Sequence, residues 1–129
     1  METRLIVCGG VDFTDYAMLS RELDALIAAL GAVTLVSGGA RGADALAERY
    51  AAERGIPIRV FPAEWKRFGR AAGPIRNRAM LRFARERTAV VAAFWNGRSR
   101  GTASMIGLAE RAGVLCRIYP YRKDADTKA

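Results

Sequence analysis

The 129-residue chain contains no histidine and only two cysteines. Histidine is the commonest general base near neutral pH and the commonest ligand of transition metals, so its absence argues against Ser-His or Cys-His catalysis and against zinc sites. Cys8 and Cys116 both lie inside apolar segments that are typical of core strands. We therefore expect two reduced, buried thiols, and neither a metal ion nor a cofactor.

Long apolar runs are also missing. None approaches the roughly 18 residues that a membrane span requires, and the opening METRLIVCGG begins a strand-like run without the layout of a signal peptide. We expect a soluble, cytoplasmic protein with no membrane partner. Because 51% of the residues are apolar, the sequence fits one compact domain over residues 1–121, followed by a polar tail over residues 122–129.

Lysine is scarce, since the chain has 18 arginines against 3 lysines and a net charge of +8. Arginine suits bidentate contacts with phosphate. From Lys66 to Arg87 the chain carries eight basic residues and the single acidic residue Glu86. Arg82, Arg85 and Arg87 are open to two interpretations, a solvated helix face or a groove that binds nucleic acid.

Apolar runs and helical periodicity alternate along the chain. Five short apolar runs are typical of buried strands and cover residues 5–8, 33–37, 58–61, 89–94 and 114–119. The segments between them predict helices over about 19–30 and 43–51, a third starting near Pro74, and a fourth over about 102–112 that Gly113 ends.

This alternation predicts an α/β fold, a Rossmann-like three-layer sandwich with a mostly parallel five-stranded sheet and helices on both faces. Numbered along the chain, the strands are expected in the order 3-2-1-4-5. Strand 4 would then separate Cys8 from Cys116 by about 9 to 10 Å, beyond the reach of a disulfide. The segment PAEWKRFGRAAGP, residues 62–74, is expected to be an irregular loop that carries function.

Glycine-rich turns follow the predicted strands. They read CGGVDFTD, SGGARGAD and FWNGRSRGTAS, and the Trp65 segment follows the third strand. In an open parallel sheet, ligands bind beyond the carboxyl ends of the strands, where glycines allow close approach and free N–H groups at helix starts hold phosphate. The same turns can equally be tight connections, since GGARG matches neither of the common phosphate-loop patterns.

Arginines stand next to three predicted helix starts, at Arg41, at Arg76, and at Arg98 with Arg100. A cation there opposes the helix dipole unless an anion lies between them, which favours a pocket for a phosphorylated ligand. We place Arg76 in the first turn of its helix. Its replacement by alanine should then weaken ligand binding and leave the empty fold intact or slightly more stable, unless Arg76 pairs with a carboxylate of the fold such as Asp44.

Other candidate residues are open to a structural interpretation. Trp65 can stack on a base or cap the core, and Phe13 can also supply a stacking surface. Asp12 and Asp44 can bind a ligand or cap helices. The complete set of candidate ligand-binding residues comprises Gly9, Gly10, Asp12, Phe13, Ser37, Gly38, Gly39, Arg41, Gly42, Asp44, Trp65, Arg76, Asn77, Asn96, Gly97, Ser99, Gly101 and Thr102.

The segments CGGVDFTD, SGGARGAD, AGPIRNRAM and AFWNGRSRGTASMIGLA resemble the YspA/YpsA-related branch of the SLOG superfamily, over roughly residues 4–119. That superfamily includes the Lonely Guy phosphoribohydrolases, which cleave the N-glycosidic bond of nucleoside monophosphates, and the DNA-processing protein DprA/Smf. The resemblance implies a Rossmann-like domain that binds a nucleotide, a nucleotide-derived signal or nucleic acid, and that forms a homodimer. It does not fix which ligand is bound.

The Lonely Guy pattern has an Arg-Lys pair followed by PGGxGTxxE. Arg76 matches the arginine, Asn77 replaces the lysine, and Gly101 and Thr102 are retained, but Met105 stands where the motif has its glutamate. The resemblance therefore carries phosphate binding and leaves enzymatic activity undecided. The carboxylates that remain as candidates to act on a ribose or base are Asp12, Asp15, Asp44 and Glu64.

Three functions follow from these observations. The leading one is a sensor or sequestering module for a nucleotide-derived, phosphorylated small molecule. The alternatives are a hydrolase of the N-glycosidic bond of nucleoside monophosphates and a nucleic-acid-binding protein that uses residues 66–87. A steep dependence of binding on salt would favour nucleic acid.

Overall fold

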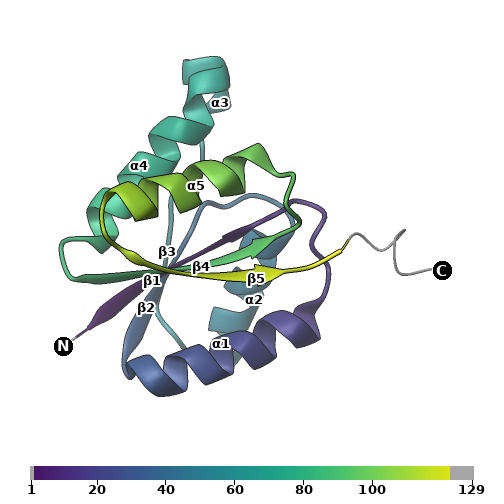
Figure 1. Ribbon diagram of the computed structural model, residues 1–129, viewed down its shortest axis with the longest axis vertical. Coiled ribbons are helices and arrows are strands. Elements are labelled where there is room, and N and C mark those ends of the chain that lie inside the picture. The colour runs from purple at the N-terminus through teal and green to yellow at the C-terminus, as the bar shows by residue number, and fades with distance from the viewer. Residues whose placement is uncertain (1, 123–129) are drawn as a thin grey trace.

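A computed structural model describes residues 2–122 of the chain, so the polar tail predicted from residue 122 onward falls almost entirely outside the described residues. Strands and helices alternate (Figure 1). The strands are β1 (Thr3–Gly9), β2 (Val33–Ser37), β3 (Ile58–Val60), β4 (Thr88–Trp95) and β5 (Leu115–Pro120). The helices are α1 (Tyr16–Leu30), α2 (Ala43–Arg54), α3 (Trp65–Phe68), the 3-10 turn η1 (Gly69–Ala71), α4 (Ala72–Ala84) and α5 (Arg100–Arg111).

The five strands form one parallel sheet in the order β3-β2-β1-β4-β5, which confirms the predicted topology. In the register of the sheet, Thr3 of β1 lies opposite Val33 of β2 and Thr88 of β4. Cys8 and Cys116 are both free, and β4 lies between the strands that carry them. The prediction of two unpaired cysteines is confirmed, but Cys116 is only half-buried, so the expectation that both thiols are buried holds for Cys8 alone.

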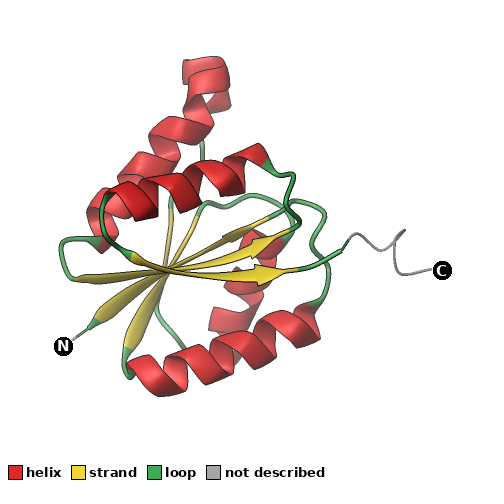
Figure 2. Cartoon of the chain, in the orientation of Figure 1, coloured by secondary structure: helices red, strands yellow, loops and turns green. Residues whose placement is uncertain are grey.

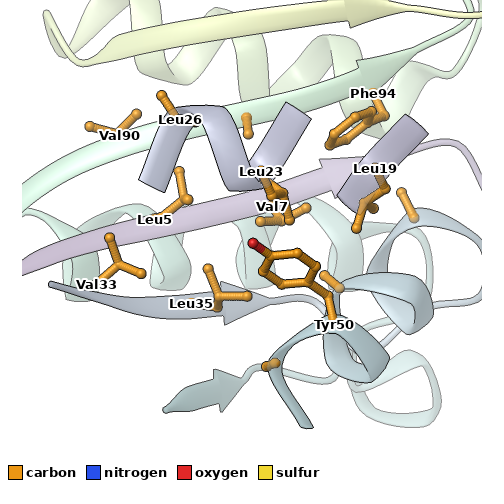
Figure 3. Packing of buried hydrophobic residues seen from close by; sticks show 14 of the residues in the cluster. Leu5, Val7, Leu19, Leu23, Leu26, Val33, Leu35, Tyr50, Val90 and Phe94 are labelled. Atoms are coloured by element: carbon orange, nitrogen blue, oxygen red, sulfur yellow. The ribbon is translucent and has the colours of Figure 1, made fainter. Parts of the chain in front are cut away.

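Helices cover both faces of the sheet, and Figure 2 shows the resulting three layers. Because side chains alternate along a strand, Leu5 and Val7 of β1 enter one core cluster and Ile6 and Cys8 enter the other. The first cluster lies under α1 and α2, where the leucines of α1 point onto the sheet (Figure 3). The second lies under α4 and α5 and includes Met105, which is fully buried.

The segment over residues 62–74 is more regular than predicted. Helix α3 and the turn η1 lead directly into α4, which begins at Ala72. Pro74 is therefore the third residue of α4, a position where a missing N–H costs nothing, and Arg76 is the fifth. The placement of Arg76 in the first helical turn was wrong, and with it the argument that its charge directly opposes the end of the helix dipole.

Within residues 2–122, no helix is long and apolar enough to cross a membrane.

Candidate functional site

A cavity of about 430 Å³ opens at the carboxyl edge of the sheet, between the turns that follow β1 and β2 and the helices α4 and α5. Four separate segments wall it, as the parallel topology predicts for this edge. The lining residues are Cys8, Gly9, Val11, Ala40, Asp44, Trp65, Arg70, Gly73, Pro74, Arg76, Asn77, Met80, Ser99, Arg100, Gly101, Thr102 and Ser104.

Arg76 is anchored in this cavity by two hydrogen bonds. Its Nη1 donates to the carbonyl oxygen of Gly38 at 2.5 Å, and its Nε donates to Oδ1 of Asn77 at 2.9 Å. A guanidinium has five N–H donors, so these bonds leave three for a ligand. The bond to Gly38 explains the glycine, because a Cβ at that position would overlap the guanidinium and lie 2.9 Å from Oδ2 of Asp44.

Asp44 lies in the first turn of α2 and lines the cavity although only 6% of it is exposed. Burial raises the pKa of its carboxyl group to about 6, while the N–H of Ala40 and the charge of Arg76 act in the opposite direction. The Ala40 N–H donates to Oδ2 at 3.2 Å. No ion pair joins Asp44 to Arg76 within the described part of the chain, and Asp44 does not cap α2, whose N-cap is Gly42. The capping interpretation of Asp44 was wrong.

The start of α5 forms the opposite wall. Ser99 is the N-cap, and its hydroxyl bonds the hydroxyl of Thr102 at 3.0 Å. The side-chain amide of Asn77 donates to the carbonyl of Gly101 at 3.2 Å, which ties α4 to this turn. The N-terminal end of α5 therefore faces the cavity with a partial positive charge.

The rim carries further cations and one aromatic ring. Arg70 and Arg100 are exposed and line the cavity, and neither has an ion pair among residues 2–122. Trp65 is 59% exposed and lies against the start of α4, where its ring would be 3.3 Å from a Cβ at Gly73. It does not cap the core, so a large part of the ring is free to contact a ligand.

Cys8, near the end of β1, is among the residues that line the cavity. Burial raises the pKa of its thiol far above its usual value, and the carboxylate of Asp44 adds to the shift. The thiol therefore stays protonated near neutral pH and is a poor nucleophile. Among the described residues, no group of three or more side chains with metal-binding chemistry comes together.

The structure brings eight of the candidate residues to this cavity, namely Gly9, Asp44, Trp65, Arg76, Asn77, Ser99, Gly101 and Thr102. Two more candidates stabilise the cavity wall without lining it. The carbonyl of Gly38 accepts a hydrogen bond from Arg76, and the hydroxyl of Ser37 accepts the N–H of Gly39 at 3.2 Å. Gly42 lies behind the wall, with a φ of 75°, against the carbonyl of Gly10. Arg41 is exposed and does not line the cavity.

Asp12 and Phe13 belong to a different cavity, of about 580 Å³, beside the end of β5. Tyr121 donates a 2.5 Å hydrogen bond to Asp12, and Asn96 donates a weaker one at 3.4 Å. Phe13 is only 1% exposed, with its ring 4.7 Å from that of Tyr121 and 5.1 Å from that of Phe94. Phe13 is thus a core residue. Asp12 joins the loop after β1 to Asn96 and Tyr121, and it is not the N-cap of α1, which is Asp15.

Asn96 and Gly97 shape the turn before α5. The side-chain oxygen of Asn96 accepts the N–H groups of Arg98 at 2.8 Å and Ser99 at 2.9 Å, and Gly97 has a φ of 81°. Gly39, with a φ of 71°, shapes the turn after β2 in the same way. Their contribution to the site is indirect, because they set the course of the backbone.

Several lining residues were absent from the predicted set, among them Arg70, Gly73, Met80, Arg100 and Ser104. The sequence did contain evidence for Arg100, because this residue stands beside a predicted helix start. Arg70 and Gly73 lie in the segment expected to be a loop, and its helical course brings them to the cavity. Met80 has the sequence pattern of any core residue and offered no signal.

Comparison with known proteins adds two findings. The model of the family described as YAcAr, the YspA, cpYpsA-related SLOG family, matches residues 3–68, just over half of the chain. The chain is also 37% identical over 87 residues to the Gene 61 protein of Mycobacterium phage D29, an alignment that covers 64% of this chain and 67% of the phage protein. No solved structure matches the chain.

Proposed function

Because this chain belongs to the YspA, cpYpsA-related SLOG family, we propose that it binds a nucleotide or a nucleotide-derived phosphorylated ligand in the cavity between α2, α4 and α5. In this proposal the protein is a sensor or a sequestering module. Membership of the family supports a nucleotide-related role in general terms, and the chemistry of the cavity supports the more specific statement.

The observation that carries the proposal is the distribution of charge in the cavity. Arg70, Arg76 and Arg100 line it, and Asp44 is the only acidic residue among the lining residues of the described chain. Arg100 is the first residue of α5 and has no ion pair among the described residues, and an arginine at a helix start is suited to hold a phosphate group. A ligand anion would offset the repulsion between the three guanidinium groups.

The same residues suggest how the ligand lies. Its phosphate would contact the N–H groups at the start of α5 and the guanidinium of Arg100, with the hydroxyl of Thr102 nearby. A base would stack on the exposed ring of Trp65. The cavity volume of about 430 Å³ lies within the usual range for small-molecule sites.

Two measurements test the proposal. Mass spectrometry of small molecules released from the purified protein should find a phosphorylated, nucleotide-derived compound. Thermal melts with a panel of nucleoside mono- and diphosphates should find ligands that stabilise the protein, and Arg100→Ala should lose this stabilisation. Arg111→Ala is the matched control, because it removes the same charge from the other end of α5. Equal ligand responses in both variants would contradict the proposed site.

N-glycosidic hydrolysis is the competing function. Met105, at the position of the motif glutamate, is fully buried in the core, so that position offers no carboxylate to the cavity. Any hydrolysis would have to use Asp44, whose pKa of about 6 is compatible with proton transfer. Incubation with nucleoside monophosphates and chromatography for free base separates the two functions, since a binding module releases none.

Nucleic-acid binding is the second alternative. The exposed residues Arg78, Arg82 and Arg85 surround a separate shallow cavity of about 330 Å³ on the outer side of α4. A solvated helix face has the same composition, and no aromatic residue of the described chain, residues 2–122, lines this cavity. Binding of an oligonucleotide that weakens steeply with salt, and that is lost in Arg82→Ala, would favour this alternative.

A further inference from the structure

We propose that Asp44 makes the cavity selective for a ribose over a 2′-deoxyribose, by accepting hydrogen bonds from the vicinal hydroxyl groups of the bound ligand. The inference rests on the proposed function, because it assigns a role within the same site. The uncharged part of the ligand next to Asp44 would then be a ribose.

The carboxylate of Asp44 can accept more hydrogen bonds than the protein supplies. A carboxylate accepts about four hydrogen bonds. The N–H of Ala40 bonds Oδ2 at 3.2 Å, and the backbone of Gly38 also stabilises the charged form. Asp44 is among the residues that line the cavity, so the remaining acceptor sites can serve a ligand. A buried carboxylate in a cavity, with acceptor sites to spare, suits a ligand that brings hydrogen-bond donors.

The charged groups around Asp44 determine which part of a ligand can lie next to it. Arg76 faces it from α4, Glu48 lies one helical turn further along α2, and the protonated thiol of Cys8 faces it from β1. Arg76 is already bonded to Gly38 and Asn77. An anionic group of the ligand would be repelled by Asp44 and Glu48, so the phosphate belongs at the Arg100 side. The group next to Asp44 must be uncharged and must donate.

The shape of a carboxylate also suits the vicinal hydroxyl groups of a ribose. The two oxygens of one carboxylate match two neighbouring hydroxyl groups, and an acidic residue bonds ribose hydroxyls in this way in many dinucleotide-binding folds. A phosphate at one end and a vicinal diol next to it are the two features of a ribonucleotide. Loss of one hydroxyl leaves a buried acceptor without its donor, which is the kind of defect that binding sites discriminate most strongly.

The test compares matched pairs of ligands by calorimetry. The probes are the 5′-monophosphates and 5′-diphosphates of adenosine and guanosine, each with its 2′-deoxy counterpart. Wild-type protein should bind the ribo form about ten- to a hundredfold more tightly, the range expected for a hydrogen bond to a charged group. Asp44→Asn should bind the ribo form more weakly and bring this ratio close to one. Glu48→Gln is the control, because it removes a neighbouring charge on the same helix and should keep the ratio.

A second readout needs no variant. The pKa of Asp44 is about 6 in the empty protein, so the carboxylate is charged at pH 8 and largely protonated at pH 5. The ribo-to-deoxy ratio of wild-type protein should therefore fall between pH 8 and pH 5. The titration of the phosphate cancels in the ratio, because both members of a pair carry the same phosphate.

The outcomes are distinct. Binding without discrimination between the members of a pair overturns the role of Asp44 and leaves the proposed function standing. An equal loss of both members in Asp44→Asn, with the ratio unchanged, also overturns it and assigns Asp44 to the support of the 38–42 turn. Failure of wild-type protein to bind any probe overturns the proposed function together with this inference.

Discussion

The guanidinium of Arg76, on α4, donates a 2.5 Å hydrogen bond to the carbonyl of Gly38, immediately after β2. This bond joins two segments that are 38 residues apart in the chain. It holds the guanidinium beside Asp44 and fixes the turn that precedes α2. Arg76 therefore supports the fold, through a backbone carbonyl and not through the carboxylate pairing that the sequence analysis left open.

Arg76→Ala should lower the free energy of unfolding of the empty protein by about 1.5 to 3 kcal/mol, because the partly buried carbonyl of Gly38 loses a charged donor. It should also weaken ligand binding. Arg100→Ala should weaken binding while leaving the empty protein as stable as wild type. Urea unfolding with and without ligand separates the effects, and an empty Arg76→Ala protein with wild-type stability would show that the Gly38 bond contributes little.

Gly42 and Gly31 form a matched pair. Their φ and ψ values are 75° and −127° for Gly42 and 86° and −142° for Gly31, a region that side chains avoid. A Cβ at Gly42 would overlap the carbonyl of Gly10 and lie 2.7 Å from Cα of Val11, whereas a Cβ at Gly31 meets nothing within 4 Å. Gly31→Ala should cost roughly 1 to 3 kcal/mol of stability, the penalty of the backbone alone.

Gly42→Ala should cost clearly more than Gly31→Ala, since backbone atoms must move to make room. Because proteins of this size are stable by only about 5 to 15 kcal/mol, this variant is expected to melt far below wild type or to fail to fold. Equal losses in the two variants, measured by thermal melts, would mean that the turn at Gly10 relaxes freely.

Asp44 should make stability depend on pH. Its pKa is about 6 in the folded protein and 3.8 in its ordinary state, so the folded protein binds the extra proton between these values. Wild-type stability should fall as pH rises from about 4 to about 6, by on the order of 1 to 3 kcal/mol from this group. Asp44→Asn lacks the titration, so its stability relative to wild type should rise across the same window and then level off. A constant difference between pH 4.5 and pH 7.5 would argue against a buried carboxylate.

The two cysteines should react at different rates in the folded protein. Cys8 is 8% exposed in the central strand, and burial raises the pKa of its thiol far above its usual value. Cys116 is half-buried on the edge strand β5, where burial also raises the pKa of its thiol but leaves it more accessible. A thiol reagent should modify Cys116 first and Cys8 much more slowly. After denaturation two thiols should titrate, and a smaller number in unoxidised protein would be incompatible with the order of the strands.

A homodimer is proposed from the resemblance to related SLOG proteins. Light scattering should then give twice the mass of one chain. A partner could lend residues to the rim around Trp65 and deepen the cavity. The mass of a single chain at the concentrations used for binding would contradict the proposal.

Helical periodicity and its alternation with short apolar runs were sufficient to predict the fold class. The five apolar runs and the alternating helices determine a parallel sheet, and the position of every strand agrees with the pattern to within two residues. The exception is the segment from Trp65 to Ala71, which lies in the stretch PAEWKRFGRAAGP that we expected to be an irregular loop. Its helical turns arise from its continuity with α4, a tertiary feature that local composition does not encode.

The cavity could be predicted in part. Glycine turns and isolated arginines located the correct edge of the sheet, because the topology alone brings those segments together. The same reasoning could not tell Phe13, which fills the core, from Trp65, which stays exposed. Nor could it find Met80 on α4 or Arg70 in the turn η1, whose positions depend on the course of α4 and of the turn before it. Side-chain direction was the missing information for Phe13, Trp65 and Met80, and the helical course of residues 65–71 was the missing information for Arg70.

Parallel strands all start at one edge of the sheet and end at the other, so the start of β1 lies on the side away from the cavity. The seven residues of β1 span roughly 23 Å between these two edges. A tether at the amino terminus would hold the molecule on a sensor surface with the cavity facing the solution. A tether attached beyond Pro120 would begin at the edge where ligands enter, so immobilisation by the two ends is expected to give different capture efficiency for the same ligand.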